Sequence, residues 1–386
     1  MPERTTFSWD RLTVTCVLSF CILVCGLSVG LVLGELRDQF AISGVLAAMH
    51  GAAFGVGLLV MSMAGLPLVA ALGRPRGFWV ASGSIVVGVA VLCAGQSWPV
   101  TLLGSTIAGL ACAFLVMLMP GIMADHHGDA MTGAFAAVNG VPGVAGIAFS
   151  LVVGAVITAG GSWRWPYLAL TLLIGAATVL VGRRVRIPNA LPTARSALPL
   201  LRQPDVRRSF IKMVHAVLAE FPIGVWAVTF LKEVGGASAG TAATLGAVWG
   251  TCIMVSRLLV PRTVALLGRA TVVVGYAMVV LGSLLLWTGP GLGVRVLGVV
   301  IAGLGCAPLY PLAVEHLYDN ADADSVTLGA LTALASGVAV TAGPLVVGVI
   351  ADSAGLRNAM LFVTGLAALG VVTNLPRRQP SPALSR

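Results

Sequence analysis

The segment LTVTCVLSFCILVCGLSVGLVLGEL, residues 12–36, is apolar along almost its whole length and carries a single charge near its end. A bilayer core about 30 Å thick is crossed by roughly 20 helical residues, so this segment is long enough to span a membrane. Eleven further apolar stretches of similar length follow. The sequence therefore predicts an all-α integral membrane protein with twelve transmembrane helices. The predicted spans are 12–36, 41–71, 77–96, 99–123, 130–159, 164–182, 209–231, 238–260, 269–288, 291–318, 325–351 and 356–375.

The composition supports a membrane protein. Hydrophobic residues make up 58% of the chain and charged residues 10%, whereas a soluble domain carries about 25% charged residues. The first apolar stretch is too long for the core of a signal peptide and lacks a cleavage site of small residues, so we expect it to stay as the first helix. All seven cysteines fall inside apolar stretches without a C-x-x-C pair, as expected for small buried side chains.

The basic residues predict the orientation. With a cytoplasmic N-terminus, 18 of the 23 Lys and Arg residues fall on the cytoplasmic side, which is the side that the positive-inside rule selects. We therefore read the net charge of +9 as a topology signal, with membrane lipids as the partners of the basic loops and no role in nucleic-acid binding. Arg outnumbers Lys by 21 to 2, which suggests a bacterial genome rich in G and C and hence the plasma membrane.

The longest polar stretch, 183–208, divides the apolar segments into six and six. Its four prolines disfavour a long continuous helix, so we interpret it as a cytoplasmic linker. The predicted domains are an N-terminal six-helix bundle over 1–182, the linker over 183–208, and a C-terminal six-helix bundle over 209–386.

The two halves resemble each other. Four residues recur 195 positions later: Ser43, Gly55, Gly73 and Arg74 reappear as Ser238, Gly250, Gly268 and Arg269. Similarly, Arg164 is matched by Arg357 at an offset of 193. Parallel repeats about an axis along the membrane normal are one architecture of secondary transporters, with the substrate site near the midplane between the halves.

Several motifs then resemble one known family. The run GLPLVAALGRPR, residues 65–76, looks like the loop signature between helices 2 and 3 of the major facilitator superfamily, and SRLLVPR, residues 256–262, looks like its echo after helix 8. The SWRWP element at 162–166 and the Gly343-Pro344 pair are similar to the family's helices 5 and 11. In one departure, the loop signature lacks the usual Asp before its first Arg, so a charge relay that closes the cytoplasmic side is not carried over.

The resemblance implies the major facilitator fold, in which two six-helix bundles related by a pseudo-two-fold axis rock about a central cavity. It also implies gating loops, for which the candidate residues here are Arg74, Arg76, Arg257 and Arg269. We expect a monomer without cofactor or metal, which moves a small-molecule substrate and is not an enzyme.

Glu220 is the sharpest candidate for chemistry. It lies at the midpoint of the seventh span, and a charge at the bilayer centre costs roughly 2.5–3.5 kcal/mol on insertion scales, which marks a functional residue by default. A carboxyl group that takes up and releases a proton suits a proton-coupled transporter. The same carboxylate also suits a cationic substrate or a structural hydrogen bond, and these alternatives stay open.

Further polar and aromatic residues are weaker candidates. His215 and His50 are candidates for proton coupling, and histidine ordinarily titrates near pH 6–7. His215 lies about 140° around the helix from Glu220, and a structural role is open for both. Asn139, Trp226, Trp249 and Tyr310 are candidates for the cavity wall, with ordinary core packing as the alternative.

Prolines and charge clusters complete the set. Pro222, Pro308 and Pro311 each remove a helical hydrogen bond, so they are candidate hinges or simple kinks. Glu35, Arg37 and Asp38 cluster at the outer end of the first span, where gate ion pairs and a solvated helix end are both open. The run DHHGD at 125–129 has no third ligand group beside it in the sequence, so we expect no metal there.

The leading hypothesis is a secondary active transporter that works by alternating access, with proton-coupled efflux of a small organic compound such as a drug or natural product. The alternative is proton-coupled uptake of a small metabolite such as a sugar or an organic acid. A membrane enzyme is disfavoured because only Glu220 has catalytic chemistry at its depth, and an ATP motor is disfavoured because the chain has no G-x-x-x-x-G-K-[ST] motif.

Overall fold

The computed structural model describes residues 9–128, 131–189, 198–321, 323 and 325–375, and all regular elements within them are helical. The first half contains α1 (Arg11–Leu27), η1 (Ser28–Val32), α2 (Leu33–Phe40), α3 (Gly44–Ala94), α4 (Trp98–His127), α5 (Met131–Thr158) and α6 (Arg164–Gly182). The second half contains η3 (Leu198–Arg202), α7 (Pro204–Glu233), α8 (Ala239–Leu267), α9 (Ala270–Thr288), α10 (Leu292–Cys306), α11 (Leu309–Asp319), α12 (Ser325–Ala354) and α13 (Leu356–Asn374).

The 51-residue α3 comprises two spans. Its backbone breaks at Gly73, where φ is 71° and ψ is 156°, in a region that glycine enters without strain. Gly57 and Gly88, on either side of the break, both lie against the same turn of α4 near Ala108 and Gly109, so α3 folds back on itself as a hairpin. The eleven long apolar helices of the described residues therefore provide twelve membrane spans. The predicted all-α membrane fold is confirmed.

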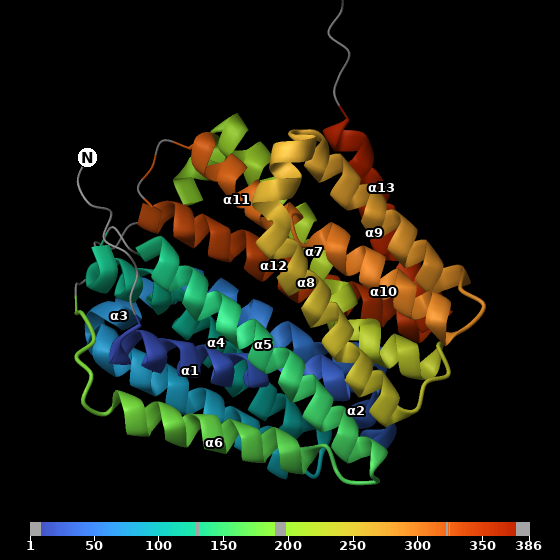
Figure 1. The fold of residues 1–386 in the computed structure, drawn as a ribbon, viewed down its shortest axis with the longest axis horizontal. Coiled ribbons are helices and arrows are strands. Elements are labelled where there is room, and N and C mark those ends of the chain that lie inside the picture. Colours follow the sequence, from blue (N-terminus) through green and yellow to red (C-terminus); the bar gives the residue numbers. More distant parts are fainter. Residues whose placement is uncertain (1–8, 129–130, 190–197, 322, 324, 376–386) are drawn as a thin grey trace, which may run out of the picture.

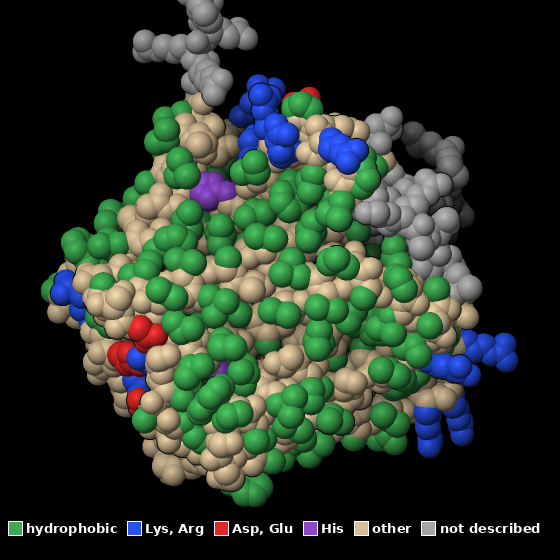
Figure 2. All heavy atoms as spheres, turned by 180° about the vertical axis from the view of Figure 1, so that it is seen from behind, with side chains coloured by type: hydrophobic (Ala, Val, Ile, Leu, Met, Phe, Trp, Pro, Cys, Tyr) green, Lys and Arg blue, Asp and Glu red, His purple; other side chains and the backbone are tan. Residues whose placement is uncertain are grey.

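The helices form two bundles. Buried apolar residues between Leu12 and Ile187 make one core, and a second core is built mainly from residues between Val206 and Ala367. In Figure 1 the labelled helices α1, α3, α4, α5 and α6 of the first half lie in the lower part of the view, and α7 to α13 of the second half lie in the upper part. Figure 2 shows a rear surface covered by hydrophobic side chains, with the charged groups near its edges, as expected for a surface that faces lipid.

The internal repeat is visible in the local geometry. Ser43 and Ser238 cap α3 and α8 in the same way, because each hydroxyl accepts a hydrogen bond of 3.2 Å from the backbone N–H three residues further on. Arg164 and Arg357 also act alike. Arg164 donates to the carbonyl of Cys93 at 3.0 Å, and Arg357 donates to the carbonyl of Trp287 at 2.9 Å, so each holds the end of the third span of its half.

Small residues line the seams between the two bundles. Gly55 of α3 leaves no room for a Cβ atom because Thr341 of α12 lies against it, and Gly154 of α5 is covered in the same way by Thr244 of α8. Helices in lipid gain no hydrophobic drive from meeting, so association depends on such close approach. The α3–α12 and α5–α8 seams are thus the principal joints between the halves.

Two differences from the predicted helix boundaries involve proline. The span predicted over 291–318 is broken at Ala307 and Pro308 into α10 and α11, because proline cannot donate the hydrogen bond that would continue the helix. The seventh span begins at Pro204 and not at 209, with proline in the first turn where its missing N–H does no harm. Within the predicted linker 183–208, residues 190–197 lie outside the described residues.

The packing of α3 against α4 provides a stability test. A Cβ atom at Gly88 would lie 2.5 Å from the amide nitrogen of Ala108, whereas Gly83 in the same helix has nothing within 4 Å of that position. We expect Gly88→Ala to destabilise the fold by about 1–3 kcal/mol, as overpacking does. In Gly83→Ala the gain in helix propensity should leave stability unchanged or raise it by up to about 1 kcal/mol. Thermal unfolding of the purified variants measures the difference, and equal losses would contradict the described contact.

Candidate functional site

The centre of the candidate site is an ion pair between the two helices α7 and α8. The Nη2 of Arg257 donates to the Oε1 of Glu220 at 3.0 Å. The Glu220 side chain is 17% exposed, whereas the Arg257 side chain is 46% exposed. Arg257, which was predicted to belong to a gating loop, therefore lies inside a membrane span beside the predicted proton site.

The α5–α8 seam explains how Arg257 becomes accessible. Ile147 of α5 lies against Gly250 of α8, and one turn further along Gly143 lies near Met254. Arg257 is three residues beyond Met254 and so projects from nearly the same face of α8. On α5 the corresponding next position is Gly140, which is exposed and has nothing within 4 Å of a Cβ position. Among the described residues, the α5–α8 contacts reach Gly143 and Met254, and Arg257 lies just beyond them on α8.

The seam also defines a direction. Because the number of spans is even, the start of α1 and the end of α13 lie on the same side, which we call the terminal side. The loops before α3, α8 and α13 lie on the other side, which we call the opposite side. Contacts between the bundles at Gly154, Gly240 and Gly44 are all near the opposite side. Arg257 lies on the terminal side of these contacts, and its side chain is 46% exposed.

Ion pairs between α2 and α7 hold the opposite side together. Arg37 donates to Glu233 at 2.6 Å, and Lys232 binds both Asp38, at 2.8 Å, and Glu35. The backbone N–H groups at the start of α3 add a further link by donating to the Asp352 carboxylate at the end of α12. The predicted cluster at 35–38 thus joins the two halves.

The partners in α7 were missed from the sequence, although a signal was present. Lys232 lies 195 positions after Arg37, and Glu233 lies 195 positions after Asp38. This is the offset of the internal repeat. The two ion pairs are therefore related by the pseudo-two-fold axis, and the equivalent helix ends meet at that axis.

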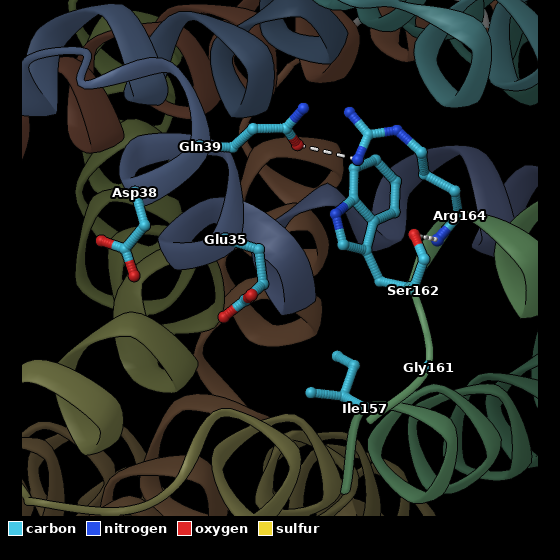
Figure 3. A pocket seen from close by; sticks show the side chains of 8 residues that line it. Glu35, Asp38, Gln39, Ile157, Gly161, Ser162 and Arg164 are labelled. Carbon is cyan, nitrogen blue, oxygen red and sulfur yellow. Dashed lines mark hydrogen bonds between the residues drawn. The ribbon is translucent and has the colours of Figure 1, made fainter. Parts of the chain in front are cut away.

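A small open pocket of about 410 Å³ lies next to this cluster (Figure 3). Glu35, Asp38 and Gln39 of α2 form one wall, and the loop before α6 with Arg164 forms the other. Arg164 and Gln39 point toward each other and form a hydrogen bond of 2.8 Å. Because Arg164 also holds two carbonyls at the end of α3, the pocket has a structural explanation.

The three predicted aromatic residues have different surroundings. Trp226 is fully buried, and its indole N–H donates to the carbonyl of Pro344 at 3.1 Å, which ties α7 to α12. Trp249 is half-buried between Gly224 of α7 and Gly303 of α10. Tyr310 of α11 packs against the apolar cluster that joins α7 to α3, α4 and α12. Of these three, Trp226 is a core residue.

The remaining predicted polar residues lie apart from the ion pair. His215 binds the carbonyl of Leu366 in α13 at 2.7 Å and stacks on Tyr276 of α9, so it faces the interior of its own bundle. His50 is buried between α3 and α4, where it contacts the carbonyl of Leu46 and the hydroxyl of Thr101. Asn139 is exposed on α5, one residue from Gly140, and has an interaction within the protein.

The predicted gating arginines and hinges also have distinct places. Arg74 forms an ion pair with Asp125 of α4 within the first bundle, whereas Arg76 and Arg269 are exposed. Pro222 stays inside a continuous α7 and lies against Gly343 of α12. Pro308 stands at the break between α10 and α11, and Pro311 falls in the first turn of α11.

The structure places Asp10 beside His126 and His127, where the sequence alone showed no third group. Asp10 caps α1 and also forms an ion pair with His126, while His127 contacts the hydroxyl of Thr13. Burial raises the pKa of Asp10, but the hydrogen bonds from Thr13 and His126 outweigh it, and the pKa lies below its ordinary value. These contacts give each of the three side chains a role in joining α1 to α4.

Comparisons with known proteins agree with this arrangement. The sequence model of the Major Facilitator Superfamily matches residues 15–330. An uncharacterised MFS-type transporter of Salmonella typhimurium is 25% identical over 297 residues, which cover 73% of this chain and 72% of the relative.

Solved structures share the fold. A mutant of the nucleoside transporter NupG superposes with a TM-score of 0.78 at 14% identity, covering 95% of this chain and 98% of NupG. A bacterial homologue of the human lysosomal transporter Spinster, in an inward-facing and unoccupied conformation, gives a TM-score of 0.68 at 14% identity, covering 94% and 95%. Twelve spans in two repeated bundles, together with the match over most of the sequence, place the chain in the major facilitator superfamily.

Proposed function

We propose that this transporter is proton-coupled, works by alternating access, and uses Glu220 as the residue that carries the proton. The observation that carries the proposal is the Glu220–Arg257 ion pair inside the membrane spans. A charge pair in this environment is costly to keep and marks function by default. Protonation of Glu220 would dissolve the pair, so proton binding and the local structure of α7 and α8 are linked.

A difference between the two sides of the protein supports alternating access. The opposite side is joined by the Arg37–Glu233 and Lys232–Asp38 ion pairs, whereas the exposed Arg257 lies on the terminal side of the α5–α8 contacts. In our proposal the terminal side is cytoplasmic, following the excess of Lys and Arg there. The described state is then open to the cytoplasm, in a bacterial plasma membrane, and the protein works as a monomer.

The direction of transport is a separate part of the proposal. Efflux of a small organic compound, the leading expectation from the sequence, requires the proton and the solute to compete for one site. Uptake, the alternative, requires them to bind together. NupG is named as a nucleoside transporter. Its likeness to this chain, at 14% identity, concerns the fold alone and does not identify the substrate.

Proton coupling is tested in liposomes that contain a pH dye and an imposed solute gradient. We expect solute movement to carry protons in the wild type and not in Glu220→Gln, because the amide cannot take up a proton. Glu315→Gln, which changes an exposed residue of α11, should keep the coupling. Equal proton movement in the wild type and in Glu220→Gln would refute the role of Glu220.

The ion pairs on the opposite side are tested by charge reversal. Arg37→Glu should favour opening of that side, because it removes the ion pair with Glu233. A cysteine placed in the α5–α8 seam by Thr244→Cys should then react with a water-soluble maleimide about two to five times faster. This factor corresponds to an ion-pair energy of a few tenths to about 1 kcal/mol. The double reversal Arg37→Glu/Glu233→Arg should restore the slow rate. The seven native cysteines are buried and give the background rate.

The orientation is tested by labelling intact cells with an impermeant maleimide. Gln96→Cys lies in an exposed loop of the opposite side, and Arg184→Cys follows α6 on the terminal side. We expect Gln96→Cys to react in intact cells and Arg184→Cys to react only after the membrane is permeabilised. The reverse pattern would place the termini outside.

A further inference from the structure

We propose that the transported solute is a small organic anion, whose acidic group binds Arg257 while Glu220 is protonated. One proton then travels in the same direction as each anion. This inference rests on the proposed function, because it takes Glu220 as the proton carrier. It adds the chemical class of the solute and the sense of the coupling.

The charges at the site select an anion. The titratable groups that surround Glu220 are Arg257 of α8, Cys306 of α10 and Tyr310 of α11, and thiol and phenol groups are ordinarily neutral at pH 7. With Glu220 ionised the pair is neutral overall. With Glu220 protonated, the charge of Arg257 is left without a counter-ion. An organic cation would meet this positive charge, whereas an anion replaces the lost partner.

The geometry of Arg257 fits an acidic group. A guanidinium has five N–H donors in a planar fork, which matches a carboxylate, sulfonate or phosphonate with two parallel hydrogen bonds. Among the described residues, the one hydrogen bond that engages this guanidinium runs from Nη2 to Glu220, and the side chain is 46% exposed. The remaining donors are therefore available to a ligand.

Arg257 lies beyond the described contacts of α5 with α8, on the terminal side, and its side chain is exposed. The described α5–α8 contacts reach Gly143 and Met254, and the next turn of α5 carries Gly140 and Asn139, which are both exposed. In this inference the solute approaches the guanidinium from the terminal side, past this turn of α5. No acidic side chain other than Glu220 contacts Arg257 within the described residues, so an arriving anion competes with one carboxylate.

The relative direction of proton and solute follows from the competition for Arg257. The solute competes with the Glu220 carboxylate, and not with the proton. Protonation of Glu220 therefore promotes binding of the anion, and the proton and the anion are carried together. For a monovalent anion the loaded carrier moves no net charge. A pH gradient of one unit should then support an accumulation of about tenfold, and a membrane potential should have no effect.

Binding is measured with three probes of matched size: benzenesulfonate, benzyl alcohol and benzyltrimethylammonium. Thermal shifts of the purified protein are recorded in detergent at pH 5.5 and pH 8, together with a series of carboxylates and phosphonates of three to ten carbons. We expect anions alone to stabilise the wild type, with affinity that falls by up to about tenfold for each pH unit as the pH rises, since one proton binds with each anion. If no anion stabilises the protein, or if the cation or the alcohol does so in their place, the inference is overturned.

The variants separate the two partners of the ion pair. Glu220→Gln mimics the protonated state, so it should bind anions equally well at both pH values. Arg257→Gln should lose anion binding, Arg257→Lys should retain part of it, and Arg262→Gln, an exposed change on the same helix, should resemble the wild type. If Glu220 and Arg257 had only structural roles, Glu220→Gln and Arg257→Gln would both lower the stability of the protein, and neither would change how anion binding depends on pH.

A lipid headgroup offers the same chemistry as a soluble anion. The measurement is therefore repeated in phosphatidylcholine nanodiscs with and without phosphatidylglycerol. We expect binding of soluble anions in both. If phosphatidylglycerol abolishes the binding of soluble anions to the wild type, Arg257 is a lipid site and the inference falls.

Transport in liposomes distinguishes failure of the inference from failure of the proposed function. If a cation or a neutral compound moves protons through Glu220 and anions do not, the proposed function stands and the inference falls. If anions bind Arg257 equally well at every pH and are transported without protons, both proposals are refuted: proton coupling through Glu220, and the joint transport of one proton with each anion. Proton-linked, potential-independent transport of an anion supports both.

Discussion

Helices in a bilayer must be held together without help from the hydrophobic effect, and the rest of this structure depends on that constraint. Lipid tails are as apolar as the side chains that face them, so close backbone approach has to supply the attraction. Gly55, Gly154 and Gly240 lie where another helix leaves no room for a Cβ atom. The joints between the halves therefore depend on close contact between helix backbones, which suits the separation of the two halves in the cycle that we propose.

Charges within the spans obey a stricter version of the same constraint. A carboxylate or a guanidinium cannot rely on water there, so each charge has to find a partner in the protein or stay near a helix end. Glu220 meets this need through Arg257, and the α2 cluster meets it through Lys232 and Glu233. These two sets lie on either side of the α5–α8 contacts. One set is deep and contains the carboxyl group that we propose as the proton carrier, and the other joins α2 to α7.

The twelve spans and the repeat follow from the sequence because both depend on patterns that are local or exactly spaced. Apolar length predicts each span, and the 195-residue offset predicts the equivalence of Ser43 and Ser238 that the two helix caps display. The break at Pro308 was visible as a helix-breaking residue, but whether the chain bends or stops there depends on packing. Glu220 could be singled out from its depth alone. Its pairing with Arg257 could not, because the sequence places Arg257 near the end of its span and does not show which way two neighbouring helices face.

The reciprocity of the Arg37–Glu233 and Lys232–Asp38 pairs has a consequence for how the protein tolerates change. Each half supplies one cation and one anion at equivalent positions, as an isologous contact does between two identical subunits. Loss of any single charge leaves one of the two pairs intact, so the fastening is redundant. Substitutions at either helix end can therefore accumulate one at a time, because the second ion pair still joins α2 to α7 while the residues of the first pair change.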